Sequence, residues 1–225
     1  MKKITYIILF VVTSVFSQGK IERDLGEFSK LAVYDGINLE IIKDSENKVK
    51  ITGKNTQYVV VKNKNGDLKI RLNLEKRFSG DRTKVTLFYK NLYNIVSHEG
   101  SNVFSKDTIK QADISFKANT GSRINIIVQT NTLSTTAVSG STISVSGNTD
   151  YHDTSSSTGA EIKAQELKTN ETYATATTGG VIDVFAVEDL EVNSKIGGMI
   201  NVYSKTNKIV ERISVGGTVN YLDQD

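Results

Sequence analysis

Three segments of the sequence, GSTISV (140–145), GAEIKA (159–164) and GGVIDV (179–184), repeat one pattern. The pattern is glycine, a small residue, any residue, Ile or Val, any residue and usually an apolar residue. Seven copies follow one another, and their glycines are separated by 21, 19, 19, 20, 18 and 19 residues. Recurrence at so regular a period is typical of repeat architectures. The other four copies are GSNVFS (100–105), GSRINI (121–126), GGMINV (197–202) and GGTVNY (216–221).

Within each copy the apolar positions alternate, which is the pattern of a β-strand with one buried face. Superimposing the copies predicts two apolar columns, and the chemically mixed residues between them are expected to face solvent. The first column holds Val103, Ile124, Ile143, Ile162, Ile182, Ile200 and Val219, and the second holds Ile126, Val145, Ala164, Val184 and Val202, with Ser105 and Tyr221 as departures at its ends. The expected outward residues are Asn125, Ser144, Lys163, Asp183, Asn201 and Asn220.

The repeat predicts an all-β fold, a right-handed parallel β-helix with coils of about 19 residues. At about 3.3 Å per residue such a coil has a contour of roughly 63 Å, enough to wind once around a small core. The right-handed sense follows the handedness of strand crossovers. A β-sandwich is the alternative, because its turn signals recur about every 8 to 12 residues. A β-sandwich does not explain, however, why the same sequence motif recurs about every 19 residues.

After residue 17 the chain divides into two parts on these patterns. Residues 97–225 are predicted to form the regular coils, and residues 18–96 a less regular β region that caps the solenoid. Within this cap, Asn65-Gly66 between two apolar runs predicts an antiparallel hairpin of residues 58–62 with 68–72. A cap is expected because an open solenoid end is an unpaired strand edge. The acidic C-terminal residues 221–225 are expected to protect, by their charge, the unpaired strand edge at the other end of the solenoid.

Residues 1–17, MKKITYIILFVVTSVFS, have the three-part pattern of a secretory signal peptide, with cleavage expected before Gln18. A transmembrane anchor is the alternative, but the apolar run of 13 residues is shorter than the roughly 20 needed to cross a bilayer. We therefore expect an exported protein with no stable membrane span after signal removal. The periplasm, the cell surface and the extracellular space all remain open as its location.

Charge is unevenly distributed along the chain that follows the signal. Residues 18–96 carry 16 basic and 10 acidic side chains, whereas residues 97–225 carry 10 basic and 15 acidic ones. The near balance overall argues against a nucleic-acid partner, which requires a concentrated basic face. The basic N-terminal part suggests either an incidental imbalance or weak attraction to an anionic envelope surface.

Few residues suggest chemistry. The chain has no cysteine, which excludes disulfides and thiolate sites, and its two histidines, His98 and His152, lack a partner at metal-ligand spacing. The sequence therefore predicts no catalytic residue, no metal site and no cofactor, and it leaves the ligand-binding residues unknown. Calcium-binding β-rolls have a third glycine and regular aspartates that are missing here.

Two sets of side chains are candidate surface sites. Stacked carboxylates could act on polysaccharides, and Glu171 and Asp189 are expected one coil apart at equivalent positions. Tyrosine rings could contact a sugar. The acidic candidates are Asp150, Asp153, Glu171, Glu188, Asp189 and Glu191, and the aromatic ones are Tyr151, Tyr173 and Tyr203.

The sequence resembles the head GIN domain family. The resemblance rests on FSKLAVYDGINLEI (28–41), KVKITGK (48–54), GDLKIRL (66–72) and KVTLFYKNLYNIVSHEGSNV (84–103), followed by the coils that begin with glycine. It implies a right-handed β-helix in an exported auto-transporter adhesin head of unknown function, and no catalytic residue carries over. Many relatives are lipoproteins, whereas this chain lacks the cysteine that lipidation needs.

Together these patterns predict a non-enzymatic structural or adhesive protein that binds a glycan or an envelope protein. A polysaccharide-acting enzyme on the same scaffold is one alternative, and catalysis would need long loops between coils that the short repeat spacing does not provide. A periplasmic scaffold that forms homo-oligomers through coil edges is the other.

Overall fold

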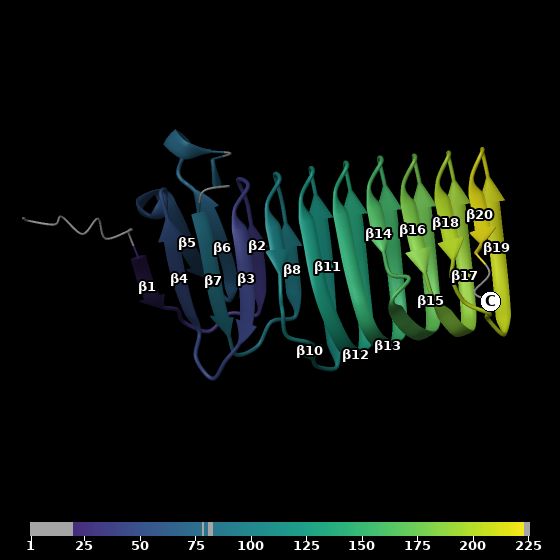
Figure 1. Ribbon diagram of the computed structural model, residues 1–225, viewed down its shortest axis with the longest axis horizontal. Helices are drawn as coiled ribbons and strands as arrows, with labels where there is room; N and C mark the ends of the chain where they lie inside the picture. Colours follow the sequence, from purple (N-terminus) through teal and green to yellow (C-terminus); the bar gives the residue numbers. More distant parts are fainter. Residues whose placement is uncertain (1–19, 78, 81–82, 223–225) are drawn as a thin grey trace, which may run out of the picture.

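The computed structural model describes residues 20–77, 79–80 and 83–222. These residues form a β-solenoid of about seven turns with coils of about 19 residues. Figure 1 shows the coils side by side along the rod, from the cap to the yellow C-terminal coil. No α-helix occurs among the described residues. The expected signal peptide, residues 1–17, lies outside them, as do the last three residues of the acidic C-terminus.

The cap combines antiparallel and parallel pairing. The hairpin predicted at Asn65-Gly66 is confirmed, since β5 and β6 pair antiparallel with Val59 opposite Leu72. Strand β4 pairs antiparallel with both β1 and β7. The cap consists of β1 (Lys20–Asp24), β4 (Lys48–Gly53), 3-10 helix η1 (Thr56–Tyr58), β5 (Val59–Lys64), β6 (Asp67–Leu72), η2 (Leu74–Lys76) and β7 (Thr83–Tyr89).

Parallel stacking begins within the N-terminal region and out of chain order. Strand β2 lies between β6 and β8, and β3 lies between β7 and β9, with parallel pairing throughout. The segment of residues 30–43 is therefore inserted between two segments that follow it in sequence. The division predicted between residues 96 and 97 stays a prediction. These strands are β2 (Lys30–Val33), β3 (Asn38–Lys43), β8 (Asn94–Ser97) and β9 (Asn102–Phe104).

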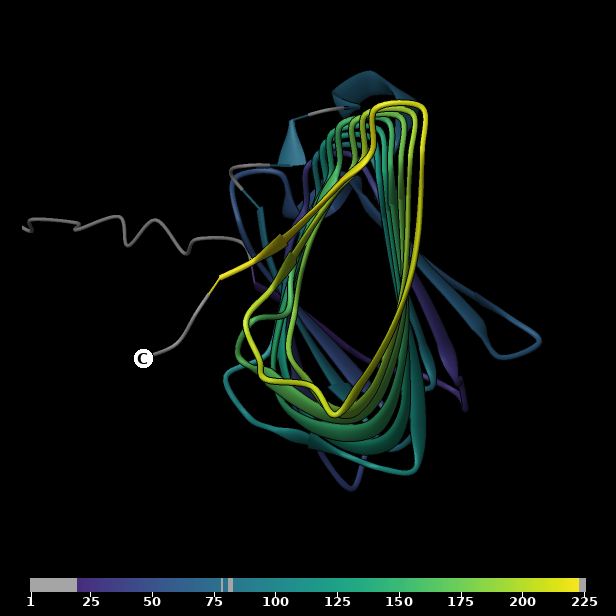
Figure 2. The ribbon, with the colours of Figure 1, turned by 90° about the vertical axis from the view of Figure 1, so that its right-hand side faces the viewer.

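From β8 onward each coil lies on the preceding one in chain order, and Figure 2 shows the outlines nearly superposed along the rod. The longer strands build one face, on which β11, β12, β13, β15, β17 and β19 follow one another. The remaining strands are β10 (Ile109–Lys110), β11 (Asp113–Asn119), β12 (Arg123–Val138), β13 (Thr142–Ser157), β14 (Glu161–Lys163), β15 (Leu167–Thr177), β16 (Val181–Val184), β17 (Ala186–Lys195), β18 (Met199–Val202), β19 (Lys208–Ser214) and β20 (Thr218–Tyr221).

The first predicted apolar column is confirmed by the register. Ile143 pairs with Ile162, and Ile162 with Ile182, and all three side chains are fully buried. The second column is buried as well, from Ile126 to Val202. Each coil therefore completes the core of its neighbours as well as their backbone hydrogen bonds.

The glycine that opens each repeat lies in a tight turn. At the third repeat, Ser139 and Gly140 both have positive φ, 56° and 67°, as in type I′ turns. The small residue that follows is buried against the preceding coil. Ser141 donates a hydrogen bond of 2.8 Å to the carbonyl of Ala118. Where glycine stands instead, at Gly198, a Cβ would lie 2.4 Å from the carbonyl oxygen of Ala176. The close approach of the preceding coil explains glycine at this position and leaves room for no more than Ser or Ala in the other repeats.

One expected outward residue is covered. Asp183 points to the outer side of its strand but is only 8% exposed, contrary to the prediction that it faces solvent. Asn201 of the next coil donates a hydrogen bond of 2.7 Å to its Oδ1. Burial raises the pKa of Asp183. Stacking on adjacent coils thus shields an outward side chain that would be open on an isolated strand.

The apolar column generates a stability prediction. Replacing Ile162 with Asp places a lone charge among buried aliphatic side chains, so we expect the free energy of unfolding to fall by at least about 4 kcal/mol. The matched control, Ser144→Asp, places its carboxylate on the outer side in register with Lys163 and should change it by less than about 1 kcal/mol. Urea unfolding followed by circular dichroism measures both, and equal stability of the two variants would contradict the assigned facing.

Candidate functional site

The outer side of the long face presents side chains in rows. Residues two apart on one strand point outward together, and in-register residues of neighbouring strands lie about 4.8 Å apart. One row runs Tyr151, Glu171, Asp189 and Lys208, on β13, β15, β17 and β19. The adjacent row, on the same strands, runs Asp153, Tyr173, Glu191 and Val210.

These rows make a surface that we call the tyrosine–carboxylate face, defined by Tyr151, Asp153, Glu171, Tyr173, Asp189 and Glu191. A shallow hollow of about 290 Å³ lies on it. Tyr151 is 39% exposed and Tyr173 is 37% exposed, so both rings have one side available to a ligand. Aromatic and acidic side chains are neighbours here both along β13 and β15 and across adjacent strands.

Polar contacts hold several of these side chains. Asn193 donates a hydrogen bond of 3.0 Å to the hydroxyl of Tyr173 and so orients its ring. Lys208 pairs with Asp189 at 2.9 Å between Nζ and Oδ1, and Arg212 forms an ion pair with Glu191. Burial raises the pKa of Asp153. Burial also raises the pKa of Tyr151, and the charges of Asp153 and Glu171 add to that shift.

The structure brings together some of the residues singled out in the sequence and separates others. Glu171 and Asp189 are direct neighbours in register, as the repeat length predicts. Asp150 and Glu188 do not line the hollow, and each accepts a hydrogen bond from an asparagine, Asn170 at 3.1 Å and Asn207 at 2.7 Å. Tyr203 lines a different hollow, of about 630 Å³, near the C-terminal coil.

The two histidines serve packing. His152 is almost fully buried, and its Nε2 lies 2.9 Å from the hydroxyl of Thr135 on the neighbouring strand. The ring of His98 stacks on Tyr34, with centroids 4.6 Å apart and an interplanar angle of 4°. Within residues 20–77, 79–80 and 83–222, no group of three or more His, Asp or Glu residues has the arrangement of a metal site.

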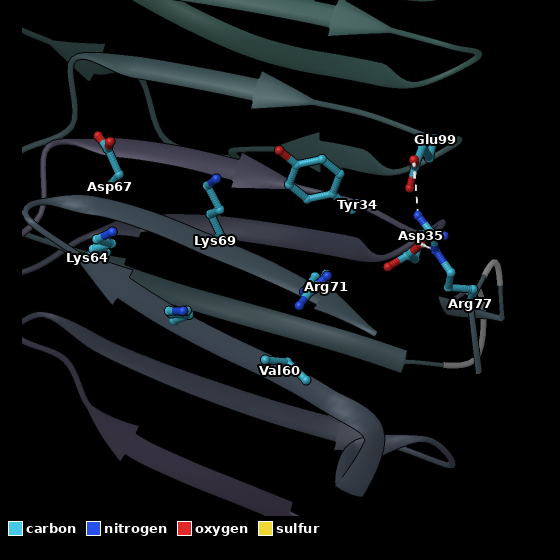
Figure 3. A pocket seen from close by; sticks show the side chains of 10 residues that line it. Tyr34, Asp35, Val60, Lys64, Asp67, Lys69, Arg71, Arg77 and Glu99 are labelled. Atoms are coloured by element: carbon cyan, nitrogen blue, oxygen red, sulfur yellow. Dashed lines mark ion pairs between the residues drawn. The ribbon is translucent and has the colours of Figure 1, made fainter. Parts of the chain in front are cut away.

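A second hollow, which the sequence did not reveal, lies on the cap. It has a volume of about 540 Å³ and is lined by outward side chains of β5, β6 and the end of β2 (Figure 3). We call it the basic cleft, defined by Lys62, Lys64, Lys69 and Arg71 together with Tyr34. The outward positions of β6 alternate with the buried Leu68, Ile70 and Leu72, which fixes the direction of its charged residues.

Three charged side chains close one end of the basic cleft. Asp35 is only 2% exposed, and its Oδ2 accepts a hydrogen bond of 3.0 Å from the backbone N–H of Leu72. The guanidinium of Arg77 lies 3.6 Å from Asp35 and 3.8 Å from Glu99. Burial raises the pKa of Glu99, and the nearby Asp35 adds to the effect.

The basic cleft and the tyrosine–carboxylate face lie on the same side of one continuous sheet. Pairing runs from β5 through β6, β2, β8, β11, β12, β13, β15 and β17 to β19. With ten strands about 4.8 Å apart, this face is roughly 43 Å long. One outward row along it reads Lys69, Ala32, Val96, Lys117, Thr136, Ser155, Thr175, Asn193 and Arg212.

Residues 27–206 match the family model described as "Putative auto-transporter adhesin, head GIN domain". The chain belongs to the head GIN domain family. Membership implies an exported protein of adhesin type. No curated protein matches this head GIN domain in sequence.

Several solved structures share the fold. A putative adhesin from Bacteroides fragilis superposes with a TM-score of 0.80 at 18% identity, covering 92% of this chain and 98% of that one. A putative adhesin from Parabacteroides merdae gives 0.72 at 16% identity, with coverage of 93% and 98%. A structure from Parabacteroides distasonis described as a putative lipid binding protein gives 0.71 at 17% identity, again with coverage of 93% and 98%.

Among the described residues of this head GIN domain, no helix has the length and apolar character that a membrane span requires.

The buried histidine predicts a pH dependence of stability. Burial lowers the pKa of His152 from 6.5 to about 3, so the unfolded chain takes up a proton near pH 6.5 that the folded chain rejects. Above pH 6.5 the neutral His152 side chain costs the folded protein no stability. Below pH 6.5 the free energy of unfolding falls by about 1.4 kcal/mol per pH unit, because only the unfolded chain binds the proton. Between pH 6.5 and pH 5, we expect wild type to lose about 2 kcal/mol more than His152→Gln. Urea unfolding at the two pH values measures this difference, and parallel losses would contradict it.

Proposed function

We propose that this head GIN domain is an exported, non-enzymatic adhesin that binds a saccharide through the tyrosine–carboxylate face. The observation that carries the proposal is that each of two partly exposed tyrosine rings lies in register with carboxylates of neighbouring strands, Tyr151 with Glu171 and Tyr173 with Asp153 and Glu191. The flat face of a tyrosine ring offers apolar contact, while its hydroxyl and the neighbouring carboxylates accept or donate hydrogen bonds. Sugars present both kinds of surface, apolar C–H faces and hydroxyl groups.

Preorganisation supports this role. The tyrosines stand on adjacent parallel strands, β13 and β15, each of which is paired on both sides, so little conformational freedom is left to lose on binding. Asn193 holds the hydroxyl of Tyr173, and Lys208 holds the carboxylate of Asp189. A ligand would meet polar groups that are already oriented by their neighbours.

A polysaccharide-acting enzyme is the rival function on the same residues. Glycoside hydrolysis needs two carboxyls, one of which donates a proton to the leaving group. Here Asp189 and Glu191 are both engaged in ion pairs with basic side chains. The hollow is also small, and the repeat spacing never exceeds 21 residues, which leaves no long insertion between repeats to wall a catalytic cleft. These features favour binding over turnover.

Loss of the tyrosine rings tests saccharide binding. A glycan array first selects a ligand, and titration calorimetry then compares wild type with the Tyr151→Ala and Tyr173→Ala variants. Each ring contributes about 1 kcal/mol, so we expect each variant to bind about fivefold more weakly. The matched control is Tyr93→Ala, because Tyr93 is 52% exposed but lines neither the tyrosine–carboxylate face nor the basic cleft.

Three results would contradict the proposal. One is an array with no saturable ligand. Another is equal weakening by Tyr93→Ala, which would show that the rings of the tyrosine–carboxylate face have no special role. The third is release of reducing ends from the selected ligand, lost in Glu171→Gln, which would assign the face to an enzyme.

The C-terminal coil favours a second candidate function, end-to-end self-assembly. Among the described residues, β19 pairs only with β17 and β20 only with β18, which leaves two strand edges open. Ile213 lies in register with the buried Ser194 yet is half exposed, and Val215 is almost fully exposed. Open edges beside apolar side chains are a template for pairing with another chain.

Self-assembly predicts a concentration-dependent mass. Sedimentation velocity of the protein should show a larger species as concentration rises, and Ile213→Lys should weaken that association at least about tenfold by placing a charge in the contact. Ile127→Lys, at an exposed apolar position on β12 several coils away from the C-terminal coil, is the control. A monomer at all concentrations would rule out this function.

A further inference from the structure

The basic cleft contains an arrangement of like charges that costs stability. Lys62 and Lys69 are directly opposite each other in the antiparallel β5–β6 pair, and both point outward. Like charges directly opposite each other destabilise a sheet. Arg71 follows Lys69 on the same side of β6, so three cations converge on one hollow. Their only described acidic neighbours stand at its ends.

The acidic residues of the cleft leave these cations uncompensated. Asp67 pairs with Lys30 at 3.6 Å, on the strand next to β6. Asp35 and Glu99 flank Arg77 at the other end. Within the described part of the chain, Lys62, Lys69 and Arg71 form no ion pair. The centre of the cleft is therefore a concentrated positive charge, suited to an anionic group.

The remaining lining suits a hydroxylated ligand. Figure 3 shows Asp67 and Glu99 at opposite ends of the cleft, with Lys69 and Tyr34 between them. Carboxylates at the ends repel a compact multivalent anion but accept hydrogen bonds from hydroxyl groups. Among the described residues, Val60 is the one aliphatic side chain of the lining. This composition gives an acyl chain almost no apolar surface to cover.

We propose that the basic cleft is a binding site for an acidic saccharide, with its carboxylate or sulfate groups on Lys62, Lys69 and Arg71. Hydroxyl groups of the same ligand reach Glu99 and Asp67 at the two ends, and the ring of Tyr34 lies alongside. The cleft is separate from the tyrosine–carboxylate face, at the other end of the same sheet face. The choice of a saccharide as the anionic ligand rests on the proposed function.

Alginate oligosaccharides, which carry a carboxylate on every sugar, are the test ligand, with neutral dextran oligosaccharides for comparison. We expect saturable binding of alginate that weakens as salt is raised, and no binding of dextran. The triple variant Lys62→Gln, Lys69→Gln, Arg71→Gln should lose at least about tenfold in affinity, because each replacement removes a charge-assisted hydrogen bond. The matched control is Lys110→Gln, Lys168→Gln, Lys205→Gln, which removes three charges elsewhere and should change affinity by less than about threefold.

Stability measurements separate loss of binding from loss of fold. Because the triple variant relieves the opposed charges, its urea unfolding midpoint should equal or exceed that of wild type. A lower midpoint would contradict the described arrangement of the cleft. The double variant Tyr151→Ala, Tyr173→Ala should retain alginate binding within about twofold, and the triple variant should retain the ligand of the tyrosine–carboxylate face. The two sets of variants therefore test the two binding sites independently, so that failure of this inference can be distinguished from failure of the proposed function.

Two outcomes would overturn the inference. One is alginate affinity that is equal in the triple variant and the control variant. The other is binding to phosphatidylglycerol vesicles, lost in the triple variant, without binding to alginate, because this would assign the cations to a lipid surface.

Discussion

The structure depends on the pairing of each coil with its neighbours in fixed register. Residues about nineteen apart lie over one another, so every coil supplies both the backbone hydrogen bonds and the apolar contacts that the next one lacks. Ile143, Ile162 and Ile182 show this most directly, since each pairs with the next and none is exposed to solvent. A shift by one residue would turn the whole apolar column outward.

The same register creates the surface chemistry. Side chains far apart in sequence become neighbours on the outer side of the sheet, as Tyr173 does with both Asp153 and Glu191. The long face carries cations on the cap and, near its other end, tyrosines and carboxylates on β13, β15 and β17, beside a parallel row of Thr136, Ser155 and Thr175.

Much of the fold can be predicted from the sequence because the length of the repeat determines which residues of neighbouring coils pair. Counting along the coils is enough to place Glu171 beside Asp189 and to bury Ile162. The burial of Asp183 could not be predicted this way, because its cover comes from the side chains of adjacent coils rather than from its own strand. The small residue after each glycine is a visible sequence pattern, but its cause, contact with a carbonyl of the previous coil, depends on how the coils stack in three dimensions.

The basic cleft escaped prediction for a topological reason. Strand β2 lies beside β6, so Ala32 pairs with Lys69. The cap has no sequence repeat from which this strand order, which differs from the chain order, could be predicted. The excess of basic residues in positions 18–96 and the alternation of charge in β6 were the available signals. Neither states which cations share a hollow.

The stacked register is tested most directly by methyl contacts in solution. In protein with labelled isoleucine methyl groups, nuclear Overhauser effects should link Ile143 to Ile162 and Ile162 to Ile182, and none should link Ile143 directly to Ile182, two coils away. Absence of the two sequential contacts, or strong contacts of these methyls with water, would contradict a wound sheet with an apolar interior.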